Sequence, residues 1–242
     1  MSSVIECRKI WKIYNEGTTA EVRALQDVNI KIEKGDFAAV IGPSGSGKST
    51  LMYLLGCLDL PTRGEIYLDG KDIAKLHESD LATIRGKKIG FIFQAFNLLP
   101  TLTALENVML PMVFQGTNEA ERKKLASHFL SMVGLKEREN HRPNELSGGE
   151  MQRVAIARSL VNHPEVILAD EPTGNLDTTT SKNIMKIFKE LHEKYKKTLI
   201  IVTHDPSVAG YAKKIVSIVD GKVTVDHGKI GKYVWQVKNG KK

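Results

Sequence analysis

The sequence predicts an α/β fold in which a mostly parallel sheet has helices on both faces, with a small antiparallel β subdomain and an inserted α-helical subdomain. Short apolar runs of β type are separated by helix-like stretches, which is typical of a parallel sheet covered on both sides. These runs are Phe37 to Ile41, Ile89 to Phe93, Val166 to Ala169 and Thr198 to Thr203. A ligand would bind at the carboxyl ends of such strands.

The segments beside the parallel core have different patterns. Alternating apolar and polar residues near Val22 to Ile32, and an Asp69-Gly70 turn after Glu65 to Leu68, predict short antiparallel strands in the first third. Between positions 95 and 160 the patterns become helical, at about 104–114, 119–133 and 150–160. We therefore expect one domain over residues 1–228, with a helical subdomain inserted at about 95–160, and a basic tail over 229–242.

Length and composition favour one cytoplasmic unit. The chain has 242 residues and 41% hydrophobic content, which is enough for one sizeable core. Its apolar stretches stay below the ~18 residues that a membrane-spanning helix needs, and its first residues lack the apolar run of a signal peptide. Cys7 and Cys57 have no metal-type spacing, so we interpret them as reduced core thiols.

The net charge of +7 raises the hypothesis of a nucleic-acid partner. The segment from Lys229 to Lys242 holds five lysines and no acid, and without it 30 basic residues face 28 acidic ones, a net charge of +2. A nearly balanced body with a basic end is weak support for a nucleic-acid groove and is compatible with anionic lipid or a partner subunit. We expect no nucleic-acid partner and assign the tail no role.

A glycine-rich loop after the strand Phe37 to Ile41 has the G-x-x-x-x-G-K-[ST] spacing of a phosphate-binding loop, so the core is predicted to be a P-loop NTPase. Its backbone N–H groups can converge on phosphate oxygens at the N-terminus of the next helix. We expect Lys48 to bridge the β- and γ-phosphates of ATP and Ser49 to bind Mg²⁺. The predicted ATP-binding residues of the loop are Gly42, Pro43, Ser44, Gly45, Ser46, Gly47, Lys48, Ser49 and Thr50.

Two adjacent carboxylates follow the apolar strand Val166 to Ala169. Successive side chains of a strand point to opposite faces, so Asp170 and Glu171 are expected to have different tasks. Asp170 can hold Mg²⁺ through water, and Glu171 can polarise the water that attacks the γ-phosphate. An acidic pair after a strand is by itself more often a surface turn, but a phosphate loop in the same chain favours the catalytic interpretation.

The motif Leu146-Ser147-Gly148-Gly149-Glu150 predicts the start of a helix. Ser147 and Glu150 have the S-x-x-E spacing of a capping box, with Ser147 as the N-cap. Two glycines in the first turn would leave the backbone amides and the positive end of the helix dipole accessible. The same turn is therefore a candidate second site for an anion.

Together these motifs resemble those of the ATP-binding subunit of ABC transporters. The resemblance rests on GPSGSGKST, LSGGE with its helix, VILADEP, the TGNLD segment of Thr173 to Asp177, Gln94 after a strand and His204 after IIVT. The motifs occur in the family's order over nearly the whole chain, to about residue 221. The resemblance implies an ATPase that uses Mg²⁺, with Glu171, His204, Gln94 and Lys48 as catalytic residues.

The resemblance also implies roles for residues whose local pattern says little. Gln94 would reach Mg²⁺ or the attacking water, which adds it to Ser49 and Asp170 as a residue near the metal. His204 would touch the γ-phosphate, although without the match it would be read as a capping or core histidine. Tyr14 matches the aromatic position that stacks on adenine, with Trp11 as the alternative.

A second copy of the chain would complete the site, because two subunits of this family sandwich two ATP molecules. The residues implied to face the ATP of the partner copy are Ser147, Gly148, Gly149, Glu150 and Asp177, with the first three at the γ-phosphate. Glu150 stands where the family commonly has glutamine. Since either side chain can accept the N-cap amide, we expect Glu150 to turn back to its own cap and away from phosphate.

The segments FIFQAFNLLPTLTALENVMLP and LSGGEMQRVAIARSL look closest to the lipoprotein-release and macrolide-efflux group. That group implies a separately encoded transmembrane permease, a place at the inner face of the cell membrane, and export or mechanical work on the membrane. The candidate contact surface for the permease is the apolar cluster of Phe96, Leu98, Leu99, Leu102 and Leu105. The same cluster could instead pack within the helical subdomain.

Two other functions use a similar set of motifs. A soluble ABC ATPase of iron–sulfur assembly would also be a single short chain, and co-purification with a membrane protein would separate it from a transporter subunit. A DNA-repair ATPase head would need a long coiled coil between the phosphate loop and the signature. Only about a hundred residues without sustained heptads separate Lys48 from Ser147, which disfavours that head.

Overall fold

The computed structural model describes residues 3–227, and the chain divides into two compact units. Unit 1 combines Met1–Leu81 with Thr198–Lys242, and unit 2 is Ala82–Lys197. The predicted basic tail over 229–242 lies outside the described residues. Within residues 3–227, no helix combines the length and the apolar character that a membrane crossing requires.

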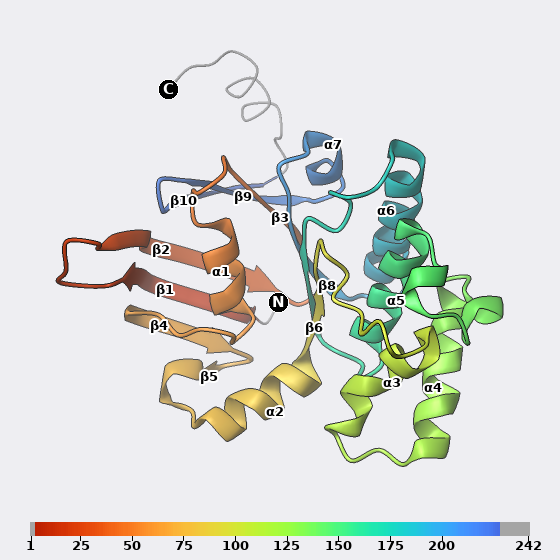
Figure 1. Cartoon of the computed structure of the whole chain (residues 1–242). Helices are drawn as coiled ribbons and strands as arrows, with labels where there is room; N and C mark the ends of the chain where they lie inside the picture. Colours follow the sequence, from red (N-terminus) through yellow and green to blue (C-terminus); the bar gives the residue numbers. More distant parts are fainter. Residues whose placement is uncertain (1–2, 228–242) are drawn as a thin grey trace. The chain divides into compact units, whose positions relative to one another are not determined.

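Unit 1 contains a four-stranded antiparallel sheet with the strand order β2-β1-β4-β5, and Figure 1 shows β1, β2 and β4 side by side. The strands are β1 (Ser3–Tyr14), β2 (Val22–Glu33), β4 (Arg63–Leu68) and β5 (Lys71–Asp72), followed by the short helix η1 (Ile73–Lys75). Antiparallel pairing in the first third is thus confirmed. Register shifts interrupt the pairing of β1 with β2, so the apolar residues of β1 do not alternate strictly and the period-two pattern missed that strand.

The second group of strands in unit 1 has the order β10-β9-β3-β8. Its members are β3 (Phe37–Ile41), β8 (Thr198–Val202), β9 (Lys214–Val219) and β10 (Lys222–His227). β3 runs parallel to both β8 and β9, and every residue of β3 and β8 is buried. These two strands therefore confirm the prediction of a parallel core. α1 (Lys48–Leu55) contacts β2 and β8, while α7 (Pro206–Ala209) contacts β3.

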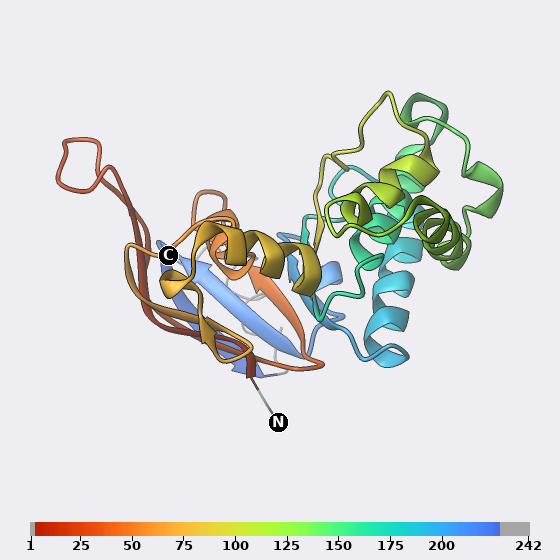
Figure 2. The ribbon, with the colours of Figure 1, turned by 90° about the horizontal axis from the view of Figure 1, so that it is seen from below.

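Unit 2 combines a parallel strand pair with a group of packed helices. β6 (Ile89–Ile92) pairs with β7 (Val166–Asp170), and α5 (Gly148–Leu160) contacts β6 and three other helices. Those helices are α3 (Ala104–Val113), α4 (Glu119–Met132) and α6 (Thr178–Glu193), and the group is visible in Figure 1 and Figure 2. Three of the four match the predicted helical segments within a few residues, and α6 lies in the helix-like stretch predicted between the β-type runs Val166 to Ala169 and Thr198 to Thr203. The remaining elements are α2 (Glu78–Lys88), which spans the division between the units, η2 (Lys136–Arg138) and η3 (Pro143–Glu145).

The apolar cluster after Gln94 is only partly accessible. Leu99 is exposed, whereas the other four side chains of the cluster are half-buried. The most exposed apolar side chain at the end of α3 is Phe114, with 79% of its surface accessible, and it lies outside the predicted cluster. Packing within unit 2 therefore partly buries four of the five cluster side chains and leaves Leu99 accessible.

The core of unit 2 depends on Phe188 of α6, which is fully buried. We predict that Phe188→Ala lowers the free energy of unfolding by about 3–5 kcal/mol, because the truncation removes apolar contacts and leaves a cavity. Phe114→Ala is the matched control and should change it by less than about 0.5 kcal/mol. Urea unfolding followed by circular dichroism measures both, and equal losses would contradict the assignment of the core.

Candidate functional site

The phosphate loop of unit 1 is held against neighbouring backbone. A Cβ atom on Gly42 would lie 2.2 Å from the carbonyl O of Ile218, and one on Gly47 would lie 2.4 Å from the carbonyl O of Ala24. Gly47 also has a φ of 105°, in the region that side chains rarely adopt. The N–H of Gly221 donates to the carbonyl O of Ser46 at 3.1 Å. The loop therefore needs glycine at 42 and 47 to pack on the rest of unit 1.

The first turn of α1 gathers hydrogen-bond donors at this loop. Its N-cap is Gly47, which has no side chain to accept the amides of that turn, and the N-terminus carries the positive end of the helix dipole. The Lys48 ammonium donates to the carbonyl oxygens of Gly42, at 3.0 Å, and Pro43, at 2.7 Å. The buried hydroxyl of Ser46 has no hydrogen-bond partner among residues 3–227. Such a cradle of donors and one cation fits the oxygens of a nucleotide phosphate.

His204 lies at the same strand edge as the phosphate loop. β3 and β8 are parallel neighbours with Val40 opposite Val202, so the chain leaves both strands at their common carboxyl edge. His204 is exposed there, and the next residue, Asp205, caps α7 by accepting the N–H of Ser207 at 2.7 Å. Within unit 1, the structure thus brings His204 to the edge from which the phosphate loop departs.

Tyr14 ends β1 at the base of the loop between β1 and β2. Its ring is partly exposed, its hydroxyl is 3.4 Å from Asp59 Oδ2, and the Lys12 ammonium lies over the ring at 5.1 Å from the centroid. Lys12 also forms an ion pair with Asp59 Oδ1 at 2.6 Å. A cation over one face polarises the ring and leaves the other face for a planar base. Lys12 and Asp59 lie 47 positions apart, so their ion pair beside the Tyr14 ring could not be predicted from the sequence.

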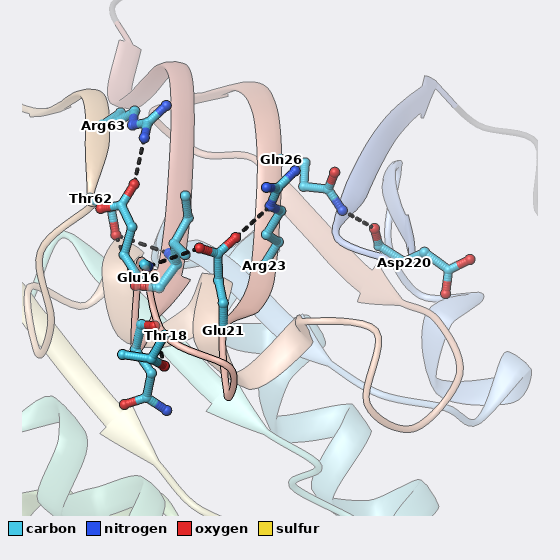
Figure 3. Close-up of polar contacts among 11 residues, drawn as sticks. Glu16, Thr18, Glu21, Arg23, Gln26, Thr62, Arg63 and Asp220 are labelled. Carbon is cyan, nitrogen blue, oxygen red and sulfur yellow. Dashed lines mark hydrogen bonds and ion pairs between the residues drawn. The ribbon is translucent and has the colours of Figure 1, made fainter.

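Polar contacts fix the hairpin that carries Tyr14, as Figure 3 shows. Arg63 of β4 pairs with Glu16 in the loop between β1 and β2, and Arg23 pairs with Glu21 at 2.9 Å. Thr62 Oγ1 accepts the N–H of Ile13 at 2.9 Å. The contacts of Thr62 and Arg63 tie the end of β1 and its loop to the start of β4, and the Arg23–Glu21 pair lies within the hairpin itself.

In unit 2, three predicted site residues meet at the carboxyl edge of the β6–β7 pair. Ile92 lies opposite Ala169, so Gln94, Asp170 and Glu171 follow the same ends of two parallel strands. Glu171 has a φ of 44°, a strained value that costs about 1–3 kcal/mol and is typical of functional sites.

The loop after Glu171 packs closely on two of these side chains. A Cβ atom on Gly174 would lie 2.8 Å from Gln94 Nε2 and 3.3 Å from Glu171 Oε2. Asn175 exchanges two hydrogen bonds with Gln94: its amide donates to the Gln94 carbonyl O at 3.0 Å and its Oδ1 accepts from Gln94 Nε2 at 3.2 Å. The buried amide of Gln152 on α5 donates to the carbonyl O of Pro172 at 2.7 Å. Sequence reasoning named neither Asn175 nor Gln152, since both act through contacts distant in sequence.

The predicted capping box at the start of α5 is confirmed. Ser147 Oγ accepts the N–H of Glu150 at 3.3 Å, and Glu150 Oε2 accepts the N–H of Ser147 at 2.8 Å. The hydrogen bond from the Ser147 backbone lowers the pKa of Glu150, and Arg138 acts in the same direction. A Cβ atom on Gly149 would lie 2.5 Å from the side chain of Thr180, so glycine is needed there for α5 to pack on α6.

Asp177 has a capping role that the motif match did not indicate. Its Oδ1 accepts the N–H groups of Thr179, at 2.9 Å, and Thr180, at 3.0 Å, at the start of α6. The Thr180 hydroxyl also donates to Asp177 and is the main reason why the pKa of Asp177 is lowered. Asp177 stays exposed, so a contact with a partner is compatible with its capping role.

The residues predicted near Mg²⁺ offer oxygen donors of the right kind. Ser49, in unit 1, offers a hydroxyl, while Gln94 and Asp170, in unit 2, offer an amide and a carboxylate. Over residues 3–227, no three His, Cys, Asp or Glu side chains are grouped so as to hold a metal ion by themselves. Hydroxyl, amide and carboxylate oxygens are each of the kind that Mg²⁺ accepts, and proteins complete its coordination with the phosphates of the substrate.

Comparison with known proteins gives consistent matches over most of the chain. A family model described as ABC transporter matches residues 25–174. An uncharacterised ABC transporter ATP-binding protein of Thermotoga maritima is 51% identical over 223 residues, which cover 92% of this chain and 94% of that protein. A solved dimeric structure of the ATP-binding cassette MJ0796 of Methanocaldococcus jannaschii, in a post-hydrolysis state bound to ADP and Pi, is similar with a TM-score of 0.85 and 45% identity. That likeness covers 93% of this chain and 99% of the solved one.

A longer relative is similar over only part of its own length. The macrolide export ATP-binding/permease protein MacB of Neisseria meningitidis serogroup B is 48% identical over 227 residues. The alignment covers 94% of this chain but 35% of that protein. The chain thus spans about a third of a relative whose name joins ATP binding and a permease.

The close approach at Gly42 gives a test of the loop. We predict that Gly42→Ala lowers the free energy of unfolding by about 2 kcal/mol or more and abolishes binding of a fluorescent ATP analogue, because the added methyl group meets the backbone at Ile218. Gly70→Ala is the control: a Cβ atom there meets nothing within 4 Å, although its φ of 77° is one that side chains rarely adopt. It should cost about 1 kcal/mol and leave binding intact. Equal effects of the two variants would refute the packing argument.

Proposed function

The chain belongs to the ABC transporter family, and on that premise we propose that it is the ATP-hydrolysing subunit that powers a separately encoded membrane permease. The family match identifies it as an ATP-binding cassette. The observation that carries the proposal is the phosphate loop, where Gly47 leaves the start of α1 without a side-chain cap and Lys48 lies against the loop carbonyls. These donors bind the phosphates of ATP.

Substrate binding uses donors that the fold has already oriented. The amides of the first turn of α1 bind phosphate oxygens, and the Lys48 ammonium exchanges the carbonyl oxygens of Gly42 and Pro43 for those of the β- and γ-phosphates. The exposed face of Tyr14 stacks on adenine while Lys12 covers the other face. Ser49, Gln94 and Asp170 hold Mg²⁺, which neutralises charge on the phosphates when it is bound.

Hydrolysis is assigned to Glu171, with help from Gln94 and His204. Glu171 accepts the proton of the attacking water, since it is the carboxylate whose strained backbone projects it from the end of β7. Gln94, held by Asn175, orients that water. His204, at the carboxyl edge of β8, donates to the γ-phosphate as negative charge develops on it.

A second copy of the chain supplies the rest of the site. The relative solved as a dimer with ADP and Pi supports a two-chain cassette, and the confirmed start of α5 provides the amides for the ATP of the partner. Ser147, Gly148 and Gly149 contact that γ-phosphate, and Asp177 lies at the same interface. ATP then joins the two chains, and its hydrolysis releases them.

The permease is proposed from the relative that joins both functions in one chain. This chain matches about a third of the macrolide export protein, so we assign it the ATP-binding part and place it on the inner face of the membrane through a separate permease. The work done is export or mechanical work on the membrane. Co-purification of the tagged chain with a membrane protein tests this arrangement, and a chain that purifies only with soluble iron–sulfur assembly partners would contradict it.

We predict that Glu171→Gln preserves ATP binding, lowers the hydrolysis rate by about 100-fold or more, and traps a two-chain complex. Glutamine keeps the shape of the side chain but cannot accept the proton, so the ATP that joins the chains persists. Size-exclusion chromatography with ATP and Mg²⁺ reveals the complex. A variant that stays monomeric at all workable concentrations would rule out the sandwich mechanism.

We predict that Lys48→Ala weakens ATP binding itself by about 10- to 100-fold, because charge-assisted hydrogen bonds to the phosphates are lost. Isothermal titration calorimetry with ATP and Mg²⁺ measures the dissociation constant. Lys189→Ala is the control, since Lys189 is an exposed lysine of α6 that pairs only loosely with Glu193, at 3.9 Å. Unchanged affinity in the Lys48 variant would disprove its role at the phosphates.

A further inference from the structure

The carboxylate of Glu150 stands at a helix end that the proposed function requires to bind an anion. A negative charge in the first turn stabilises the helix through its dipole, but it also repels a phosphate that approaches the same amides. Both carboxylate oxygens are engaged. Oε2 accepts the N–H of Ser147 at 2.8 Å and its hydroxyl at 2.9 Å, while Oε1 lies 3.3 Å from Nε of Arg138.

Arg138 is placed by the short helix η2, twelve positions before Glu150. Its Nη1 lies 3.1 Å from His141 Nε2, and the N–H of His141 donates to the Arg138 carbonyl O at 3.0 Å. The first contact engages a different guanidinium nitrogen from the one that faces Glu150, and the second fixes the backbone between Arg138 and His141. The Glu150 side chain is 19% exposed and that of Arg138 is 48% exposed, so the carboxylate is the more shielded partner and solvent screens its charge less.

We propose that Arg138 is a positioning residue that neutralises Glu150 and holds it on the Ser147 cap, so that the first turn of α5 can accept the γ-phosphate of ATP bound to a second copy of the chain. This inference rests on the proposed function. It explains how the chain tolerates a carboxylate at a position where an uncharged side chain would avoid the repulsion. Arg138 acts through Glu150, because the guanidinium contacts that carboxylate.

Neighbouring cations provide the contrast that the test needs. Lys136 lies two positions before Arg138, but its ammonium pairs with Glu139 at 2.9 Å and also contacts Ser127. Its removal deletes one positive charge from the same short helix while the Glu150 pair stays intact. Lys136→Gln is therefore the matched control for Arg138→Gln.

The experiment measures ATP-dependent dimerisation of the full chain in the Glu171→Gln background, by analytical ultracentrifugation across ATP concentrations with Mg²⁺. Arg138→Gln should raise the ATP concentration for half-maximal dimer by about tenfold, because the negative charge of Glu150 then lacks its ion pair and repels the phosphate. The double variant of Arg138→Gln with Glu150→Gln should stay within about twofold of Glu150→Gln alone. Lys136→Gln and the charge-preserving Arg138→Lys should stay within about twofold of the parent.

Rescue by Glu150→Gln distinguishes charge neutralisation from a structural role. If Arg138→Gln weakens dimerisation equally with and without Glu150→Gln, or leaves it unchanged, the inference is wrong. Thermal unfolding without ATP checks that each variant is folded. If Arg138→Gln alone folds poorly, the comparison of Arg138→Lys with the double variant of Arg138→Gln and Glu150→Gln still tests the inference. A parent Glu171→Gln chain that never dimerises with ATP would instead overturn the proposed function, and the inference with it.

Discussion

The close approach of the phosphate loop to the backbone around it is the constraint on which unit 1 depends. β3 is buried between two parallel neighbours, and the loop that leaves it must fold over the carbonyl groups of Ile218 and Ala24 before α1 begins. Two positions without side chains make that path possible, and the turn they form directs the amides of α1 outward from the strand edge. The binding of phosphate thus arises from the same steric requirement that lets the parallel strands and α1 pack together.

Much of this arrangement could be predicted from the sequence because it depends on short, local sequence patterns. Fully apolar runs identified β3 and β8 as buried parallel strands, and the S-x-x-E spacing predicted the capping box of Ser147 and Glu150 before any contact was known. The loop spacing and the carboxylates after β7 likewise depend on short segments. The α/β class and the family could be predicted from such patterns, because each pattern involves only residues that are close together in the sequence.

The contacts that orient the site residues could not be predicted in this way. Asn175 reaches Gln94 across 81 positions, and Asp59 reaches Lys12 across 47, so neither pair leaves a trace in local periodicity. The period-two pattern missed β1 because register shifts displace its apolar residues. A helix was expected between β7 and β8 but without bounds, although Asp177 is a strong N-cap for α6. Local sequence patterns do not predict which distant segments pair, because that pairing is determined by the assembled strands and helices.

The two helix ends that would face a second chain are capped by side chains of their own segments. Ser147 and Glu150 close the start of α5, Asp177 closes the start of α6, and Gly149 packs directly on Thr180, so the two ends are joined within unit 2. In the proposed dimer, association of the two chains would therefore fix few additional side-chain rotamers. Most of its entropic cost would come from the loss of free translation and rotation. Separation of the chains in the proposed dimer would likewise require no local refolding at these two helix ends.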